Sequence, residues 1–431
     1  MTVDLIVRNV TLPDGRPGHD VAIADGRITS IAPRIEGEAR ETIDGRGYLL
    51  APPFVDCHFH LDSTLSLGQP RFNVSGTLLE GIALWGELKP RLTHEAVVER
   101  ALRYCDLAVS QGLLAIRSHV DVCDDRLLAV EALLEVKRRV KPYLDLQLVA
   151  FPQDGYFRSP SAARNLERAL DLGVDVVGGI PHFERTMADG AASVRVLCEI
   201  AARRGLMVDL HCDESDDPMS RHVETLAYEA QRLGLGARAT GSHLTSMHSM
   251  DNYYVSKLLP LIAESGMSAI SNPLINLTLQ GRHDAYPRRR GMTRIAEMRA
   301  LGIPVALGQD CVMDPWYGLG GADMLDVAHM AVHGVPMTSR EAIRWTFDAV
   351  TEIPARIIGL EDYGIRVGAH ADMVLLQAND PIEAVRLRAT RLLVLRRGKI
   401  IARTPARTSQ LSLDGRPADL EPASYVPRAA V

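Results

Sequence analysis

The amino-acid sequence predicts a (β/α)₈ barrel, an α/β fold, with a small β-sandwich domain built from both ends of the chain. Strand-like runs alternate with helical stretches through the middle of the sequence, which is typical of such barrels. Polar residues follow nearly every one of these runs. Both chain ends instead carry short strand-like runs separated by turn residues. We therefore assign residues 51–367 to the barrel and residues 1–50 together with 368–431 to the sandwich.

The two chain ends resemble each other in their pattern. Near the start, Asp14-Gly15 and Asp25-Gly26 are typical of hairpin turns between short apolar runs. Near the end, Arg397-Gly398 separates two similar runs. We expect the ends to pair into one domain, with strands at residues 5–10, 20–23, 27–31, 371–376, 391–396 and 399–402.

Eight strands are predicted for the barrel, spread over about 300 residues, somewhat more than the typical length of about 250. Helical segments lie between most of them; the segment 93–110, for example, begins with Thr93 as a capping residue and has apolar residues at helical spacing. An open, doubly wound sheet is the alternative. It is disfavoured because candidate ligands follow many strands, not one switch point. The barrel strands are expected at residues 49–55, 113–118, 144–150, 174–178, 206–210, 238–242, 267–271 and 303–307.

Composition describes a soluble globular protein. The chain has 431 residues, of which 46% are apolar and 24% charged, and its net charge is −6. A mildly acidic surface argues against a nucleic-acid partner, and no apolar run approaches the roughly 20 residues of a membrane span. The six cysteines are scattered and no secretory signal is visible. We expect a cytoplasmic protein with free thiols and no membrane partner.

Polar groups collect where the barrel strands end. In (β/α)₈ barrels the working residues sit at the C-terminal ends of the strands. A polar cluster that recurs at every strand end points to a functional site, although any one member could be a loop residue with a structural role. In strand order these residues are His58 and His60; His119 and Asp121; Gln153 and Asp154; His182 and Glu184; His211 and Glu214; His243 and His248; Asn272, Asn276 and Gln280; and Asp310 and Cys311.

Four of these residues form a candidate metal site. His58 and His60 lie two apart beyond an apolar run, so their side chains can point to the same side. His211 and Asp310 add a third imidazole and a carboxylate. This mixture suits zinc or ferrous iron, since calcium and magnesium prefer all-oxygen ligands. No lysine ends the fourth strand to support a carbamate bridge, so we expect one divalent ion, Fe²⁺ or Zn²⁺.

The same strand ends offer groups for proton transfer. A bound cation lowers the pKa of its water to about 7, which makes hydroxide available. His243 could hold that hydroxide and relay protons. Glu214 follows His211 by three residues and could act as an acid toward a substrate. The alternative for Glu214 is a surface carboxylate within the acidic run 213–217.

Other motifs fail on inspection. His182-Phe183-Glu184 matches the H-x-E of zinc nucleobase deaminases, but no P-C-x-x-C follows. The segment 234–239 fits a dinucleotide fingerprint but precedes a strand, which is the wrong order. His182 and His248 could belong to a substrate pocket or to loops. Asp56, Asp62 and His119 could orient the metal ligands or be plain structural polar groups, and we favour the structural interpretation.

With these residues the chain resembles the amidohydrolase superfamily and, within it, the bacterial cytosine deaminases. The H-x-H at His58 and His60 is general to the superfamily. The more specific segments are 75–82, Pro152-Gln153 and 314–317. The resemblance covers nearly the whole chain, and its other segments are 56–62, 119–122, 149–153, 176–184, 211–214, 242–243, 272–274, 279–282 and 310–317.

The resemblance implies hydrolytic deamination of cytosine to uracil and ammonia. Metal-bound hydroxide would attack the amine-bearing ring carbon, with Asp310 and His243 taking the proton of the water. Glu214 would protonate the adjacent ring nitrogen, and Asp310 would deliver a proton to the leaving amine. Relatives of this kind also suggest a homo-oligomer. The ring would be contacted by Gln153, by the backbone at Leu78, and by Cys311 and Trp316.

One position departs from the family pattern. The family has two successive aspartates after the eighth strand, whereas the second is Cys311 here. A neutral swap is one interpretation. The other is an altered preference for the ring: a substituted cytosine, isocytosine or another amino-azaheterocycle. A related alternative is an amidohydrolase that cleaves another C–N bond, such as that of an N-alkylamino triazine.

Overall fold

The computed structural model describes residues 3–422, and its middle part is a barrel of eight parallel strands. The strands lie side by side in chain order from β6 to β13, without the reversal of a doubly wound sheet. A bridge between Phe59 and Asp310 joins the first strand to the segment after the last. The prediction of a (β/α)₈ barrel is confirmed. The strands are β6 (Phe54–Phe59), β7 (Leu113–Asp121), β8 (Asp145–Phe151), β9 (Val176–Gly179), β10 (Met207–Cys212), β11 (Ala239–His243), β12 (Ser268–Ser271) and β13 (Val305–Leu307).

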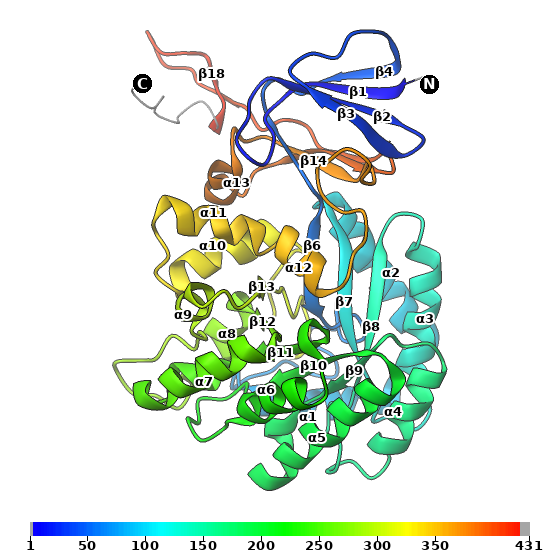
Figure 1. Cartoon of the computed structure of the whole chain (residues 1–431), viewed down its shortest axis with the longest axis vertical. Helices are drawn as coiled ribbons and strands as arrows, with labels where there is room; N and C mark the ends of the chain where they lie inside the picture. Colours follow the sequence, from blue (N-terminus) through cyan, green and yellow to red (C-terminus); the bar gives the residue numbers. More distant parts are fainter. Residues whose placement is uncertain (1–2, 423–431) are drawn as a thin grey trace.

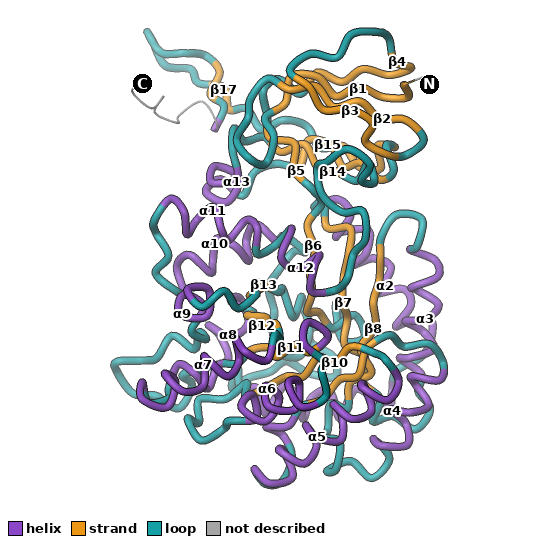
Figure 2. Tube along the Cα trace, viewed as in Figure 1, coloured by secondary structure: helices purple, strands orange, loops and turns teal. Residues whose placement is uncertain are grey.

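Helices surround the barrel on its outside (Figure 2). The helix predicted at 93–110 is present as α2 (His94–Ser110), and the Thr93 hydroxyl caps it by accepting the Ala96 N–H at 3.2 Å. The other α-helices lie on either side of α2 in the chain, and most of them follow the strand-then-helix order. They are α1 (Leu78–Leu88), α3 (Leu128–Val140), α4 (Ala162–Asp171), α5 (Met187–Arg204), α6 (His222–Arg232), α7 (Asn252–Ser265), α8 (Pro273–Leu279), α9 (Ile295–Ala300), α10 (Met324–Gly334), α11 (Arg340–Asp348), α12 (Glu352–Ile357) and α13 (Pro381–Leu387).

The first predicted barrel strand is divided in two, which corrects the sequence prediction. Residues 49–51 form β5 (Leu49–Ala51), which pairs with the second domain, and only β6 belongs to the barrel. Pro52 and Pro53 separate them, because proline lacks the N–H that a continuous strand would need. The apolar run therefore connects the two parts of the molecule, and it delivers His58 and His60 to the far end of β6.

The chain ends form two four-stranded sheets that cap the end of the barrel opposite the strand C-termini (Figure 1). One sheet has the order β3-β2-β1-β4 and the other β16-β15-β14-β5. Their facing apolar side chains, Leu5, Val7, Ile23, Met373 and Leu395 among them, make a second hydrophobic core. Residues 423–431 lie outside the described part. The strands are β1 (Val3–Val10), β2 (His19–Ala24), β3 (Arg27–Ala32), β4 (Ala39–Asp44), β14 (Met373–Leu376), β15 (Arg391–Arg396) and β16 (Lys399–Arg403), followed by β17 (Ser409–Gln410) and β18 (Asp419–Leu420).

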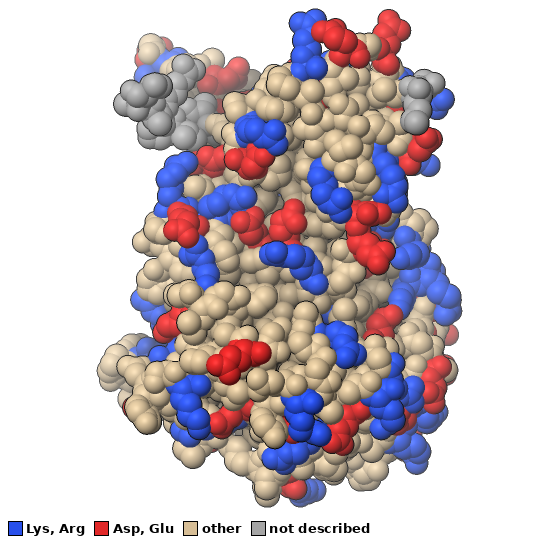
Figure 3. Space-filling model, viewed as in Figure 1, with Lys and Arg blue, Asp and Glu red and all other residues tan. Residues whose placement is uncertain are grey.

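Charged residues of both signs are mixed over the face drawn in Figure 3, and no large area of one sign appears on it. Within residues 3–422, none of the helices has the length and apolar character needed to cross a bilayer. On this face the surface charge singles out no site, whereas polar groups are buried at the mouth of the barrel.

Candidate active site

The C-terminal ends of the barrel strands surround a cavity of about 340 Å³. Every residue predicted for the site except His58 lines it. Ile180, Ile275 and Leu279 also line it, and the sequence interpretation did not include them. The predicted residues on the wall are His60, Leu78, Gln153, His211, Glu214, His243, Asp310, Cys311 and Trp316.

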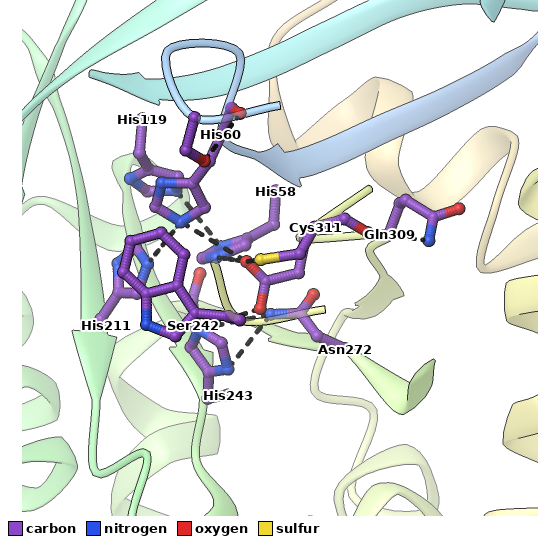
Figure 4. Close-up of polar contacts among 12 residues, drawn as sticks. His58, His60, His119, His211, Ser242, His243, Asn272, Gln309 and Cys311 are labelled. Atoms are coloured by element: carbon purple, nitrogen blue, oxygen red, sulfur yellow. Dashed lines mark hydrogen bonds and ion pairs between the residues drawn. The ribbon is translucent and has the colours of Figure 1, made fainter. Parts of the chain in front are cut away.

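Figure 4 shows the imidazoles of His58, His60 and His211 close together, and the Asp310 carboxylate lies beside His58 and His60. The Nε2 atoms of His58 and His60 each lie 3.4 Å from Oδ1 of Asp310. The Nε2 atoms of His60 and His211 are 3.1 Å apart. The side chains come from β6 and the residue after it, from β10 and from the segment after β13, so the barrel brings together residues far apart in sequence.

The chemistry of these donors fits a metal ion. Nε2 of His58 is buried and has no hydrogen-bond partner among the described residues, as expected for an atom meant to hold a ligand. Burial lowers the pKa of His60 to about 4 and the pKa of His211 well below its usual value. Imidazoles that stay neutral keep a lone pair for coordination. Among the described residues, the ligand atoms of His58, His60 and Asp310 lie within 4.8 Å of one another, and those of His58, His211 and His243 form an overlapping group. These groups could hold a divalent ion of the kind that takes nitrogen and oxygen ligands.

Two polar side chains, those of His119 and Asp56, contact His58. Nε2 of His119 lies 3.2 Å from Nδ1 of His58. The carboxylate of Asp56 accepts the His58 backbone N–H at 3.2 Å and that of Gln309 at 3.1 Å. The contact from His119 is of the kind that fixes the orientation of a ligating imidazole, whereas Asp56 holds the backbone of His58. The interpretation of His119 as a plain structural group missed this contact with His58.

Asp310 and His243 face each other across the cavity. Oδ2 of Asp310 lies 3.8 Å from Nε2 of His243. Burial alone would raise the pKa of Asp310, but His58 and His243 lower it on balance, so Asp310 is a carboxylate that can accept a proton. Both residues have left-handed backbones, with φ of 68° at Asp310 and 71° at His243. Such strain costs about 1–3 kcal/mol per residue and is common at active sites.

Glu214 is a buried acid on the cavity wall, with 5% of its surface exposed. Burial and the nearby charge of Asp310 raise the pKa of Glu214 well above its usual value, so it can carry a proton at neutral pH. The alternative of a surface carboxylate is wrong.

The neighbour of Glu214 explains how that carboxyl is held. The Asp213 side chain accepts hydrogen bonds from Ser220 Oγ at 2.7 Å, from Nδ1 of His222 at 2.7 Å and from the backbone N–H of Val223 at 2.8 Å. These bonds fasten the loop after β10 to the start of α6. Glu214 therefore enters the cavity from a fixed backbone.

Cys311 and Trp316 form another part of the wall. Cys311 is 4% exposed, and burial raises the pKa of its thiol, which stays neutral. Its Sγ lies 3.6 Å from Oδ1 of Asp310. Trp316 packs directly against α1, where a Cβ at Gly81 would come within 2.2 Å of the indole ring.

His182 and His248, which the sequence left open, are absent from the cavity wall. Nδ1 of His182 lies 2.9 Å from the carbonyl oxygen of His211, and His248 pairs with Asp216 at 3.0 Å. Sequence reasoning also assigned no role to Asn272 and Asn276, which contact His243. Two signals could have found them: their place after the seventh predicted strand, and their spacing of four residues, which predicts a shared helical face.

Nearly the whole chain is similar in sequence and in structure to known proteins. The model of the amidohydrolase family matches residues 41–402. The crystal structure of 5-methylcytosine deaminase from Klebsiella pneumoniae with 5-fluorocytosine superimposes with a TM-score of 0.92, at 41% identity, covering 94% of this chain and 99% of that one. N-isopropylammelide isopropyl amidohydrolase of Pseudomonas sp. (strain ADP) is 29% identical, over 93% of this chain and 97% of its own. Pterin deaminase of Rhizobium rhizogenes is 30% identical, over 91% and 89%.

Proposed function

The chain belongs to the amidohydrolase family and is a hydrolase of C–N bonds, and from this premise we propose that it deaminates a free cytosine-like base, with 5-methylcytosine preferred over cytosine. The products would be the corresponding uracil and ammonia. The metal would be one Fe²⁺ or Zn²⁺ ion held by His58, His60, His211 and Asp310.

The observation that carries the substrate proposal is Cys311 on the cavity wall. A buried neutral thiol next to Asp310 replaces the second carboxylate expected from the family pattern. A small, polarizable side chain leaves room for a methyl group that a charged and hydrated carboxylate would oppose. One methyl group in such a pocket changes the free energy of transition-state binding by about 1–3 kcal/mol, which is about 10–200-fold in discrimination between substrates. The 41% identity to a 5-methylcytosine deaminase supports the same substrate.

The proposed reaction assigns one task to each polar group. A bound divalent ion would lower the pKa of a water molecule and supply hydroxide near neutral pH. Asp310, already a carboxylate, accepts the first proton of the attacking water. Glu214 donates its proton to the ring nitrogen next to the amine-bearing carbon, which makes that carbon electrophilic. Gln153 and the backbone at Leu78 orient the amide edge of the ring, and Trp316 packs against it.

The second half of the reaction restores both acids. The proton on Asp310 passes to the amine, the C–N bond breaks and ammonia leaves. The remaining hydroxyl proton returns to Glu214 as the ring carbonyl forms. One water is consumed for each ammonia released, and no further reactant is needed.

Ammonia release from a panel of rings tests the proposal. Protein loaded with Fe²⁺ or with Zn²⁺ is assayed with cytosine, 5-methylcytosine, isocytosine and N-isopropylammelide. We expect kcat/KM for 5-methylcytosine to exceed that for cytosine by about 10-fold or more. Equal or better turnover of cytosine would reject the role of the C5 substituent.

The panel also addresses a second candidate, hydrolysis of an N-alkylamino triazine. This candidate is supported by the similarity to the N-isopropylammelide amidohydrolase over 97% of that protein's length. Release of isopropylamine without ammonia release from any pyrimidine would support it and reject the deaminase.

A further inference from the structure

His243 is contacted on its Nδ1 side by two buried asparagines. Nδ2 of Asn276, on α8, lies 3.1 Å from Nδ1 of His243. Nδ2 of Asn272, the residue before α8, lies 3.3 Å from Nδ1 and 3.5 Å from Nε2 (Figure 4 shows Asn272 beside His243). Oε1 of Glu214 is also 3.5 Å from Nδ1, which is the outer limit of a hydrogen bond. The shortest of these contacts comes from Asn276.

A second contact fixes which end of the Asn276 amide faces the histidine. Oδ1 of Asn276 lies 3.2 Å from the backbone nitrogen of Asn272. A backbone N–H can only donate, so the atom that meets it must be the amide oxygen. This assignment from the hydrogen-bond network leaves the NH₂ group toward His243. Asn276 is fully buried and has no freedom to turn over without losing both bonds.

The orientation of Asn276 in turn fixes the histidine. An amide NH₂ group donates and cannot accept, so Nδ1 of His243 accepts from Asn276 at 3.1 Å. The contact of Asn272 with Nε2, at 3.5 Å, is at the outer limit of a hydrogen bond and does not decide the tautomer. A proton on Nδ1 would point N–H against N–H in a buried site, which is costly. The ring therefore carries its single proton on Nε2.

The Nε2 proton points to the reacting side of the cavity. Nε2 lies 3.8 Å from Oδ2 of Asp310, too far for a direct hydrogen bond. A water oxygen about 2.8 Å from each atom would bridge them. It would accept from His243 and donate to Asp310.

We propose that Asn276 is a positioning residue that holds His243 in the tautomer protonated on Nε2, so that His243 only donates to the attacking water and Asp310 alone accepts the water proton. This rests on the proposed deaminase function and changes one expectation drawn from the sequence, in which His243 and Asp310 shared that proton. Proton balance is unaffected: the water proton moves to Asp310 and then to the amine, while His243 keeps its own.

Nuclear magnetic resonance of the zinc-loaded enzyme reads the tautomer directly. Long-range ¹H–¹⁵N correlations on ¹⁵N-histidine protein distinguish a protonated Nε2 from a protonated Nδ1. The His243 signals are assigned by their loss in His243→Gln. We expect Nε2 protonation in the wild type and a proton on Nδ1 in Asn276→Asp, because a carboxylate accepts where the amide donated. Thr278→Val, on the same helix, is the matched control and should leave the His243 signals unchanged.

Steady-state kinetics provides a second test. A glutamine at position 243 can accept from Asn276 through its oxygen and donate toward the water through its nitrogen, but it cannot take a proton. We expect His243→Gln to keep kcat within about 30-fold of the wild type, and His243→Leu to lose about 10³-fold or more.

The outcomes separate this inference from the proposed function. A proton on Nδ1 in the wild type, or His243→Gln as inactive as His243→Leu, would overturn the role of Asn276. Failure of every ring in the ammonia panel would reject the deaminase, and the NMR result would still decide the tautomer. If Asn276→Asp does not fold, the wild-type spectrum and the His243 pair decide it.

Discussion

His60 and His211 direct their Nε2 atoms toward each other across 3.1 Å, although 151 residues separate them in the chain. Two neutral imidazole nitrogens at this distance share at most one proton, so the pair is stable only with a common proton or a common cation. The unpartnered Nε2 of His58 and the Asp310 carboxylate face the same point. This relationship leads directly to the first prediction.

Removing one of these donors should remove the metal and the activity together. His211→Ala or Asp310→Ala leaves three of the four donors. We expect less than about 0.1 equivalent of tightly bound metal and a loss of about 10³-fold or more in kcat/KM. Elemental analysis of the purified variants measures the first and ammonia release the second. His248→Ala, whose side chain lies outside the cavity wall, is the control. A variant that loses its metal and keeps its turnover would contradict the site.

The barrel and the meeting of the four residues of the candidate metal site could be predicted from sequence because each depends on a local pattern. An apolar run followed by a polar residue marks the end of a strand, and parallel strands in a barrel place all such ends at one mouth. His58, His60, His211 and Asp310 follow this pattern, so their meeting did not require knowledge of side-chain packing.

The features of the site that could not be predicted from the sequence depend on contacts across the barrel. His119 reads as an ordinary strand residue until it meets His58. Asp213 reads as a member of an acidic surface run, and the same run kept a surface carboxylate as the alternative for Glu214, because the burial of both residues follows from the loop that Asp213 fastens to α6. Ile275 and Leu279 have no polar group to draw attention, yet they line the cavity.

Glu214→Gln should separate metal binding from proton transfer. Glutamine keeps the shape of the side chain but has no proton of suitable acidity for the ring nitrogen. We expect a full equivalent of metal and a fall in kcat of about 10²–10⁴-fold. The measurement is metal content together with kcat on the best ring of the panel, and turnover near that of the wild type would exclude Glu214 as the acid.

Cys311→Asp should change the preferred substrate without removing the metal. The new carboxylate would be charged and hydrated where the C5 methyl group would lie, so 5-methylcytosine should lose about 10-fold or more relative to cytosine. The ratio of the two kcat/KM values is the readout. Cys311→Ser, which keeps the size and stays uncharged, should hold the ratio near that of the wild type. An unchanged ratio in Cys311→Asp would mean that the cysteine is a neutral replacement.

Acid should destabilise the fold through His182. Burial lowers the pKa of His182 from 6.5 to about 4, so between these values the unfolded chain binds more protons than the folded one. The contribution of neutral His182 to the free energy of unfolding is fully present above about pH 6.5. It is lost as the pH falls toward 4, with a slope of up to about 1.4 kcal/mol per pH unit. His182→Asn keeps an N–H for the His211 carbonyl but does not titrate. Urea unfolding at pH 7, 6 and 5 should show the advantage of the wild type over the variant shrinking, and a constant difference would reject this role.

Two glycines of α1 offer a matched test of the cavity wall. A Cβ at Gly81 would lie 2.2 Å from Cδ1 and 2.4 Å from Nε1 of Trp316, whereas a Cβ at Gly86 would meet nothing within 4 Å. Gly81→Ala must therefore displace the indole, which lines the cavity, at a cost of about 1–3 kcal/mol. Gly86→Ala only improves the helix, by about 0.5–1 kcal/mol.

The expected result is a loss of about 10-fold or more in kcat/KM for Gly81→Ala with the metal content unchanged, because Trp316 is a wall residue and not a ligand. Gly86→Ala should keep its kcat/KM and unfold at a slightly higher temperature. Both variants carry the same chemical change on the same helix, so helix propensity cancels between them. If Gly81→Ala is as active as Gly86→Ala, Trp316 does not limit the space for the ring, and discrimination at C5 must come from Cys311 without help from the indole.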